Sequence, residues 1–253
     1  MYSSCENKTI RDKEGLIVYQ ENQISWIRNF EPLNPVSIPR WPTRGGIYES
    51  LYLNNPITTD WVPWLATNYK WENNNKKLLF TIRPNVQWSD GKPFSAHDVA
   101  YTLNLWNQYP ALDTRNAWEY LKSVVAVSDT LVQIDFKRIY VPGFEAIAGA
   151  PIIPKHIWKE LEDPLDFSNP DPVGTGPFTE ILRFNTQVWE LGKNHNYWQK
   201  GKPYVEKLIF PTFSTNEQTT LALLSGKLDW AGAFIPAIQL SLIHISEPTR
   251  LRR

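Results

Sequence analysis

The sequence has a single cysteine and no excess of charge of either sign. With only Cys5 among 253 residues, no disulfide can form within the chain, so cysteine usage does not report the redox compartment. Lysine plus arginine number 26, and aspartate plus glutamate also number 26. This balance gives no support for a nucleic-acid partner or an anionic membrane surface. No apolar run approaches the length of a transmembrane helix.

Motifs of catalysis and metal binding are also missing. The sequence has no Gly-x-Ser-x-Gly motif and no phosphate-binding loop. Its histidines do not show metal-ligand spacing, and nothing in the sequence pairs the carboxylates that a glycoside hydrolase would need. These residues are His97, His156, His195 and His244, and Asp60, Asp90, Asp98 and Asp229. We therefore expect a protein that is not an enzyme and has no cofactor. A carbohydrate-active enzyme or a carbohydrate-binding module is the alternative.

Aromatic residues and proline are abundant. The chain has 12 tryptophans, 11 tyrosines, 11 phenylalanines and 20 prolines. Hydrophobic residues make up 42% of the sequence, which is enough for a buried core. The prolines indicate many rigid loops, and the aromatic rings offer flat apolar faces for a core or for a ligand.

Local patterns predict a mixed α/β or α+β fold. Strands are expected at residues 16–19, 77–83, 131–136, 188–191 and 205–210. Ser95 and Asp98 predict a capping box that opens a helix, and Thr215 predicts another helix that ends at Gly226. Residues 155–161 are expected to form a short helix. The spacing of Ile47, Tyr48, Leu51 and Tyr52 suits one face of a further helix.

Both ends of the chain are expected to lie outside the folded core. The small residues before Cys5 are typical of what remains of a lipoprotein signal. We therefore expect residues 1–15 to be a mobile terminus with a lipidation site at Cys5. Residues 240–253 look like the translation of a sequencing adapter rather than native protein. On this interpretation the natural gene continues past Gln239.

Four sequence blocks carry a resemblance to a known family. The first covers residues 63–99 and includes VQWSDGKPFSAHDV at 86–99. The others are PVGTGPF at 172–178, NHNYW at 194–198 followed by GKP at 201–203, and LSGKLDW at 224–230. In this order the blocks resemble family 5 bacterial extracellular solute-binding proteins, which are oligopeptide, dipeptide, nickel and oligosaccharide binders of ABC importers. His97 departs from the acidic residue common at its position.

The resemblance implies a two-lobed fold of the type II periplasmic-binding-protein class with an extra subdomain. Ligand would lie between lobes that close about a hinge. Residues 16–44 and 170–239 would form the first lobe, and residues 45–169 a subdomain inserted into that lobe. The second lobe would lie beyond Gln239. Gly174, Gly176 and Pro177 are expected to have architectural roles, since they let the chain bend sharply and then stiffen it.

The ligand is expected to be an oligosaccharide or an oligopeptide. Several segments resemble cello-oligosaccharide binders, and sugars need aromatic planes together with polar donors and acceptors. The predicted ligand-binding residues are Trp26, Arg28, Asn29, Phe30, Tyr48, Trp230 and Phe234. The resemblance further implies a monomer, located in the periplasm or on the cell surface, that delivers its ligand to an ABC permease.

Overall fold

The computed structural model describes residues 15–33 and 42–232, which fall into two compact units. Of the described residues, 15–27, 182–190 and 205–232 form the smaller unit, and 28–33, 42–181 and 191–204 form the larger unit. Strands β8 (Phe178–Phe184) and β9 (Val188–Lys193) each contain residues of both units. The boundaries predicted for the first lobe and its inserted subdomain divide the chain differently from these two units. They stay a prediction.

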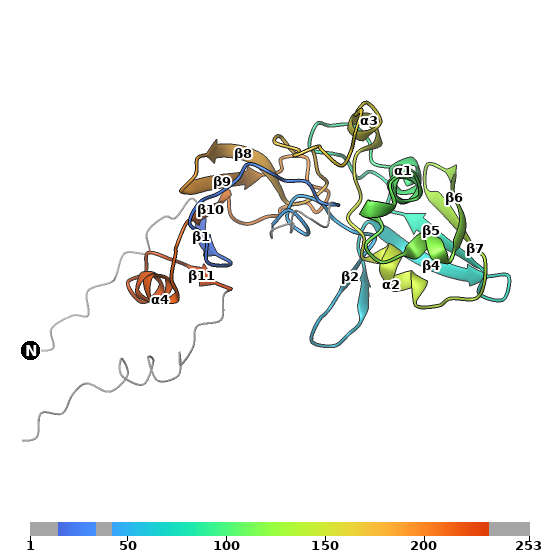
Figure 1. The fold of residues 1–253 in the computed structure, drawn as a ribbon, viewed down its shortest axis with the longest axis horizontal. Coiled ribbons are helices and arrows are strands. Elements are labelled where there is room, and N and C mark those ends of the chain that lie inside the picture. Colours follow the sequence, from blue (N-terminus) through green and yellow to red (C-terminus); the bar gives the residue numbers. More distant parts are fainter. Residues whose placement is uncertain (1–14, 34–41, 233–253) are drawn as a thin grey trace, which may run out of the picture. The chain divides into compact units, whose positions relative to one another are not determined.

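The smaller unit is built around parallel strand pairs. Its elements are β1 (Gly15–Tyr19), β10 (Lys207–Pro211), β11 (Trp230–Ala231) and helix α4 (Asn216–Leu224). The sheet has the strand order β11-β1-β10-β9-β8, and β1 pairs in parallel with both β10 and β11 (Figure 1). The predicted strands at 16–19, 188–191 and 205–210 are thereby confirmed.

Helix α4 begins and ends as the sequence predicts. The Thr215 side chain accepts a hydrogen bond from the Gln218 backbone N–H at 3.3 Å, which satisfies one of the free donors of the first turn. Gly226 follows the helix with a φ of 68°, a left-handed conformation that glycine adopts without strain.

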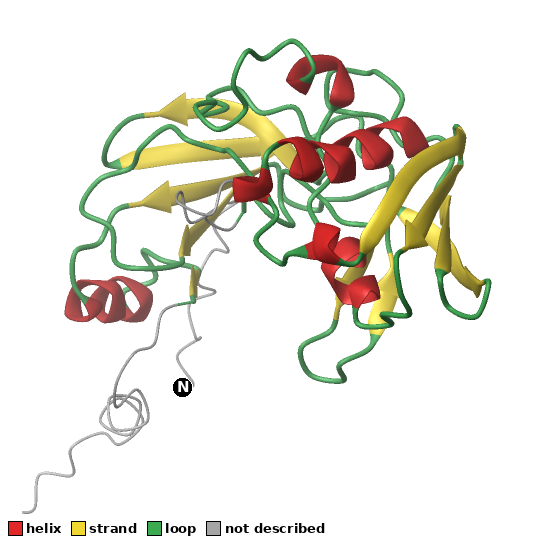
Figure 2. Cartoon of the chain, turned by 45° about the vertical axis from the view of Figure 1, so that its right-hand side comes forward, coloured by secondary structure: helices red, strands yellow, loops and turns green. Residues whose placement is uncertain are grey.

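The larger unit contains an antiparallel sheet covered by a helix. The strands are β4 (Ala66–Glu72), β5 (Lys77–Ile82), β6 (Leu121–Ser128) and β7 (Leu131–Phe136), in the order β4-β5-β7-β6. Helix α1 (Ala96–Gln108) packs on one face of this sheet (Figure 2). Strand β7 alternates as predicted, so that Val132, Ile134 and Phe136 are all buried.

Shorter elements complete the larger unit. They are the hairpin of β2 (Tyr52–Asn54) and β3 (Trp61–Pro63), helices α2 (Gly143–Ala148) and α3 (Lys155–Trp158), and 3-10 turns at Pro110–Leu112 and Ala117–Glu119. The predicted capping box of α1 is present. The Ser95 side chain accepts a hydrogen bond from the backbone at N3, and the Asp98 carboxylate accepts one from the Ser95 backbone N–H.

The prediction of a helix at residues 47–52 is wrong. Ser50 forms a bridge with Pro151, and Tyr52 begins strand β2. The backbone groups of this segment bond to distant residues: the Ile47 carbonyl accepts from the Gly176 N–H at 2.9 Å, and the Glu49 carbonyl accepts from the Ile152 N–H at 3.0 Å. The segment is buried on both sides, so apolar residues occur at positions of both sides. Their combined spacing happens to fit one face of a helix. Residues 24–30 contain no helix or strand.

Two glycines permit the close packing of this segment. A Cβ atom on Gly174 or Gly176 would lie well inside van der Waals contact with the carbonyl oxygens of Ile47 or Gly46. The approach allows the Phe178 N–H to donate to the Gly46 carbonyl at 3.2 Å, beside the bond from Gly176 to Ile47. Gly174 and Gly176 therefore have the architectural role that the sequence predicts.

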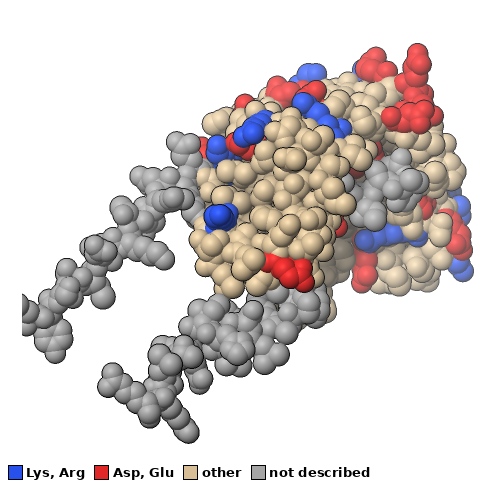
Figure 3. Space-filling model, turned by 60° about the vertical axis from the view of Figure 1, so that its left-hand side comes forward, with Lys and Arg blue, Asp and Glu red and all other residues tan. Residues whose placement is uncertain are grey.

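On the face drawn in Figure 3, acidic and basic side chains are interspersed among uncharged residues. This agrees with the equal numbers of acidic and basic residues in the sequence.

Replacing Gly176 by alanine tests the close approach. We expect Gly176→Ala to lower the free energy of unfolding by about 1–3 kcal/mol, because the added methyl overpacks a backbone contact. Urea denaturation measures the change. Gly226→Asn is the matched control, since nothing lies near its Cβ position and asparagine tolerates the left-handed conformation. Equal midpoints for Gly176→Ala and the wild type would contradict the packing argument.

Candidate functional site

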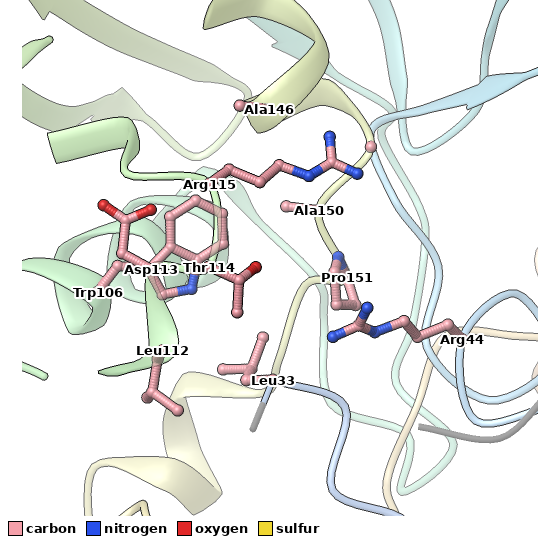
Figure 4. A pocket seen from close by; sticks show the side chains of 11 residues that line it. Leu33, Arg44, Trp106, Leu112, Asp113, Thr114, Arg115, Ala146, Ala150 and Pro151 are labelled. Carbon is pink, nitrogen blue, oxygen red and sulfur yellow. The ribbon is translucent and has the colours of Figure 1, made fainter. Parts of the chain in front are cut away.

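Two adjoining hollows lie within the larger unit. The wider hollow has a volume of about 290 Å³ and the narrower one about 40 Å³. Both are lined by Arg44, Arg115, Gly149 and Pro151. Figure 4 shows the narrower hollow, with the guanidinium groups of Arg44 and Arg115 on either side of Pro151. The two hollows therefore form one candidate site with a shared arginine pair.

The wall of the wider hollow comes largely from the segment that precedes and enters β2. Tyr48, Ser50 and Tyr52 line the hollow, whereas Glu49 and Leu51 do not. This alternation is the period of extended chain, in which successive side chains point to opposite sides. Strand β3 adds Trp61, whose register partner is Asn54 of β2. The site thus combines aromatic rings with polar groups.

The arginine pair is anchored but keeps donors available. Arg44 donates from Nε to the Pro32 carbonyl at 2.7 Å, and Arg115 donates from Nη1 to the Glu145 carbonyl at 3.0 Å. Burial lowers the pKa of Arg44, the negative charge of Glu31 raises it, and the positive charge of Arg115 lowers it. Guanidinium groups stay charged at neutral pH, so the remaining N–H groups can serve ligand acceptors.

Trp106 and Asp113 both line the narrower hollow. The Trp106 indole nitrogen is buried and has no hydrogen-bond partner among the described residues. The carboxylate of Asp113 accepts the backbone N–H groups of Ala117 and Trp118, each at 2.8 Å. The donors left for a ligand are therefore those of the arginine pair, which favour a ligand with acceptor oxygens.

Behind the wall, Glu49 is buried among aromatic donors. Its Oε1 accepts from Trp64 Nε1 at 2.6 Å and from the Tyr197 hydroxyl at 3.0 Å, and its Oε2 accepts from Trp198 Nε1 at 3.0 Å. Only 1% of Glu49 is exposed. Burial raises the pKa of Glu49 to about 7, although the hydrogen bonds from Trp198, Trp64 and Tyr197 oppose the rise.

The predicted ligand-binding residues are distributed between the two units. Trp26 lies in the core of the smaller unit, where it packs edge-on against Trp189 and Phe210. Trp230 is about half exposed, at 49%, and pairs with Val18 in the sheet. Phe234 and Cys5 lie outside the described residues.

The remaining predicted residues lie in the larger unit. Arg28 forms an exposed ion pair with Asp171 and donates to the Pro170 carbonyl at 3.0 Å. The Asn29 side chain accepts the Glu31 N–H at 3.0 Å, and Phe30 is buried. Tyr48 lines the wider hollow and receives a 2.7 Å hydrogen bond on its hydroxyl from Asn169. Of these residues, the structure brings only Tyr48 to the hollows, and ligand contact by the predicted set stays a prediction.

Sequence reasoning did not select Glu49, Trp61, Trp106 or Arg115. Arg44 was not predicted to bind ligand either. Arg115 lies between two 3-10 turns and carries no periodic signal. The alternation of Tyr48, Ser50 and Tyr52 is the one pattern that could have revealed the wall.

The comparisons identify the family. Residues 60–246 match the family model "Bacterial extracellular solute-binding proteins, family 5 Middle". The chain belongs to this family. The matched range extends into residues 240–253, whose origin as an adapter stays a prediction because they lie outside the described part of the chain.

Individual relatives are binding proteins. The chain is 28% identical to the nickel-binding periplasmic protein of Escherichia coli over 81% of this chain and 40% of that protein. It is 26% identical to the oligopeptide-binding protein OppA of Bacillus subtilis, over 66% of this chain and 34% of that protein. The chain thus spans about two fifths or less of the length of these relatives.

A solved structure confirms the fold class. The periplasmic oligopeptide-binding protein of Thermotoga maritima matches with a TM-score of 0.84 and 26% identity, over 92% of this chain and 44% of that chain. A mannohexaose-bound structure of the same protein matches with a TM-score of 0.82, 27% identity and the same coverage. The chain is therefore a partial periplasmic-binding-protein-like α/β fold.

Within residues 15–33 and 42–232, no helix is both long and apolar enough to span a bilayer. The same residues contain no cluster of three histidine, cysteine, aspartate or glutamate side chains that could hold a metal ion.

The raised pKa of Glu49 predicts a pH-dependent stability. A carboxyl whose folded-state pKa lies above its unfolded value stabilises the fold below the unfolded pKa, and this stabilisation is lost as pH rises through about 7. Relative to the double variant Glu49→Gln, Trp198→Phe, which has no carboxyl at position 49 and no Trp198 donor opposed to the glutamine amide, we expect the wild type to lose roughly 2–3 kcal/mol of unfolding free energy between about pH 5 and pH 8.5. Urea denaturation of both proteins across this range measures the difference. Parallel pH curves would show that Glu49 does not titrate with a raised pKa.

Proposed function

We propose that the chain is the N-terminal lobe region of an extracytoplasmic substrate-binding component of an ABC importer, and that it captures an oligosaccharide of the cello-oligosaccharide type. An oligopeptide is the other ligand class within the family. The proposal includes a monomeric, non-enzymatic protein that delivers its ligand to a membrane permease, with lipidation at Cys5 as an anchor.

The wider hollow is the observation that supports a sugar ligand. It places the Trp61 ring beside Ser50, Asn54 and the arginine pair. A sugar ring has apolar C–H faces that pack on aromatic planes, while its hydroxyl oxygens accept hydrogen bonds from guanidinium and amide groups. The mannohexaose bound to the Thermotoga maritima protein supports the same ligand class.

The proposed mechanism is capture by lobe closure. A ligand that contacts both lobes shifts the population toward the closed state by its differential affinity for that state. The hollows described above supply contacts from one part of such a protein. We therefore expect this chain alone to bind ligand weakly, in the millimolar range, because it lacks the enclosure of a closed receptor.

Titration calorimetry with defined ligands tests the proposal. We expect cellotetraose to bind the chain and Trp61→Ala to weaken binding by about tenfold or more, because the ring supplies the aromatic plane. Tyr204→Ala is the control, since this aromatic residue of the larger unit is 85% exposed and lines neither hollow. The predicted residue Trp230 is tested in the same way with Trp230→Ala.

Other ligands decide between the alternatives. Binding of tri- and tetrapeptides without binding of cellotetraose would overturn the sugar assignment in favour of peptide capture. Turnover of a chromogenic cellobioside, lost on replacement of one carboxylate, would support the carbohydrate-active enzyme instead.

A further inference from the structure

The wall of the wider hollow is one side of an extended segment, and Glu49 occupies the other side. Tyr48 and Ser50, which line the hollow, are the immediate neighbours of Glu49. The Glu49 carbonyl also accepts the Ile152 N–H at 3.0 Å, next to Pro151 of both hollows. A change in the position of Glu49 is therefore transmitted directly to residues that line the hollow.

The side chain of Glu49 connects this segment to two other parts of the chain. Trp64 follows strand β3, while Tyr197 and Trp198 lie more than 140 residues away from Glu49 in sequence. The two indoles are in edge contact, with ring centroids 5.3 Å apart. Because the indole N–H groups donate to different oxygens, both carboxylate oxygens have fixed partners.

We propose that Glu49 is a positioning residue for the ligand hollow: its contacts with Trp64, Tyr197 and Trp198 set the position of residues 48–52, and protonation of its carboxylate changes that position. The proposal rests on the proposed function only in taking the wider hollow as the ligand site.

Protonation must disturb the donor arrangement. An indole N–H can only donate, whereas the Tyr197 hydroxyl can either donate or accept. A proton on Oε1 can be accommodated if the Tyr197 hydroxyl turns to accept it, whereas a proton on Oε2 opposes the Trp198 N–H. The two protonation states therefore have different preferred geometries. The pKa of about 7 means that both are populated near neutral pH.

Three other titratable residues lie on the elements around Glu49: Tyr197, Arg83 and His195. Burial and the charge of Glu49 raise the pKa of Tyr197 far above neutrality. Arg83 lies 4.5 Å from the centroid of the Trp198 ring and donates from Nε to the Trp64 carbonyl at 2.7 Å. His195, the nearest histidine in sequence to this cluster, is exposed. Residues 150–153 and Thr175 carry no ionisable group.

Fluorine NMR of the 5-fluorotryptophan-labelled chain tests the proposal without a ligand. Single tryptophan-to-phenylalanine variants assign the signals of Trp61, Trp64 and Trp198. We expect Trp64 and Trp198 to shift with a common midpoint near pH 7, and Trp61 in the hollow to shift with the same midpoint. A Trp61 signal that is unchanged while Trp64 and Trp198 titrate would overturn the positioning role. No titration at Trp64 or Trp198 would overturn protonation of Glu49 itself.

Replacing Glu49 by glutamine needs a second change to keep the fold. In either orientation the amide NH₂ of Glu49→Gln faces one indole N–H, so the single variant leaves two donors opposed. The double variant Glu49→Gln, Trp198→Phe removes one of these donors. We expect it to fold and to show pH-independent Trp61 and Trp64 signals. A Trp61 midpoint that persists in the double variant would assign the effect to another group and overturn the proposal.

Ligand titration separates this inference from the proposed function. With cellotetraose, we expect the dissociation constant of the wild type to change by about threefold or more between pH 5.5 and 8.5, and that of the double variant to change less. Absence of cellotetraose binding at every pH would contradict the proposed ligand but leave the fluorine result to decide the role of Glu49. Binding with no difference in pH dependence between the two proteins would overturn the coupling of Glu49 to the hollow.

Discussion

The buried carboxylate of Glu49 is the interaction on which the larger unit depends. It joins three parts of the chain, because Trp64 and the adjacent Tyr197 and Trp198 all donate hydrogen bonds to it. A buried carboxylate is tolerated only when its oxygens are hydrogen-bonded, so each of these contacts offsets part of the desolvation cost. The glycines at 174 and 176 serve the same junction, since they let the backbone of this segment lie directly on residues 46 and 47.

The same junction gives the candidate site its form. An extended segment held on its buried side presents alternate residues to the hollow, and hairpin β2–β3 continues it to Trp61. Rigid placement of a few aromatic and donor groups is what a binding protein needs, because groups that are already ordered lose less entropy when ligand binds. The arginine pair has each side chain fixed by one carbonyl, which leaves the rest of each guanidinium for a ligand.

The sequence predicted local structure better than it predicted the site. Ser95 and Thr215 act through neighbouring residues, so their capping roles could be predicted without knowledge of the fold. Residues 47–52 could not, because burial from two sides places apolar residues at spacings that also fit a helix. Family blocks identified the fold class, since they record a whole arrangement rather than a local preference.

The positions of aromatic residues in the sequence also did not predict which of them line the site. Trp26 and Trp61 are indistinguishable in sequence, yet one packs against Trp189 and Phe210 and the other lines the wider hollow. Glu49 is one of 26 acidic residues, and its role depends on partners as distant as Tyr197 and Trp198. Such a residue can be found only once the fold has brought these partners together.

Linkage gives the Glu49 arrangement a consequence for ligand capture. If protonation of a buried group alters the hollow, then filling the hollow must alter the proton affinity of that group by the same factor. A ligand that favours one position of residues 48–52 would therefore release or take up part of a proton near neutral pH. The coupling requires no ionisable group on the ligand, because it acts through the backbone between Glu49 and its neighbours Tyr48 and Ser50. Proton uptake or release on binding of a neutral sugar would thus report on the wall of the hollow rather than on the chemistry of the sugar.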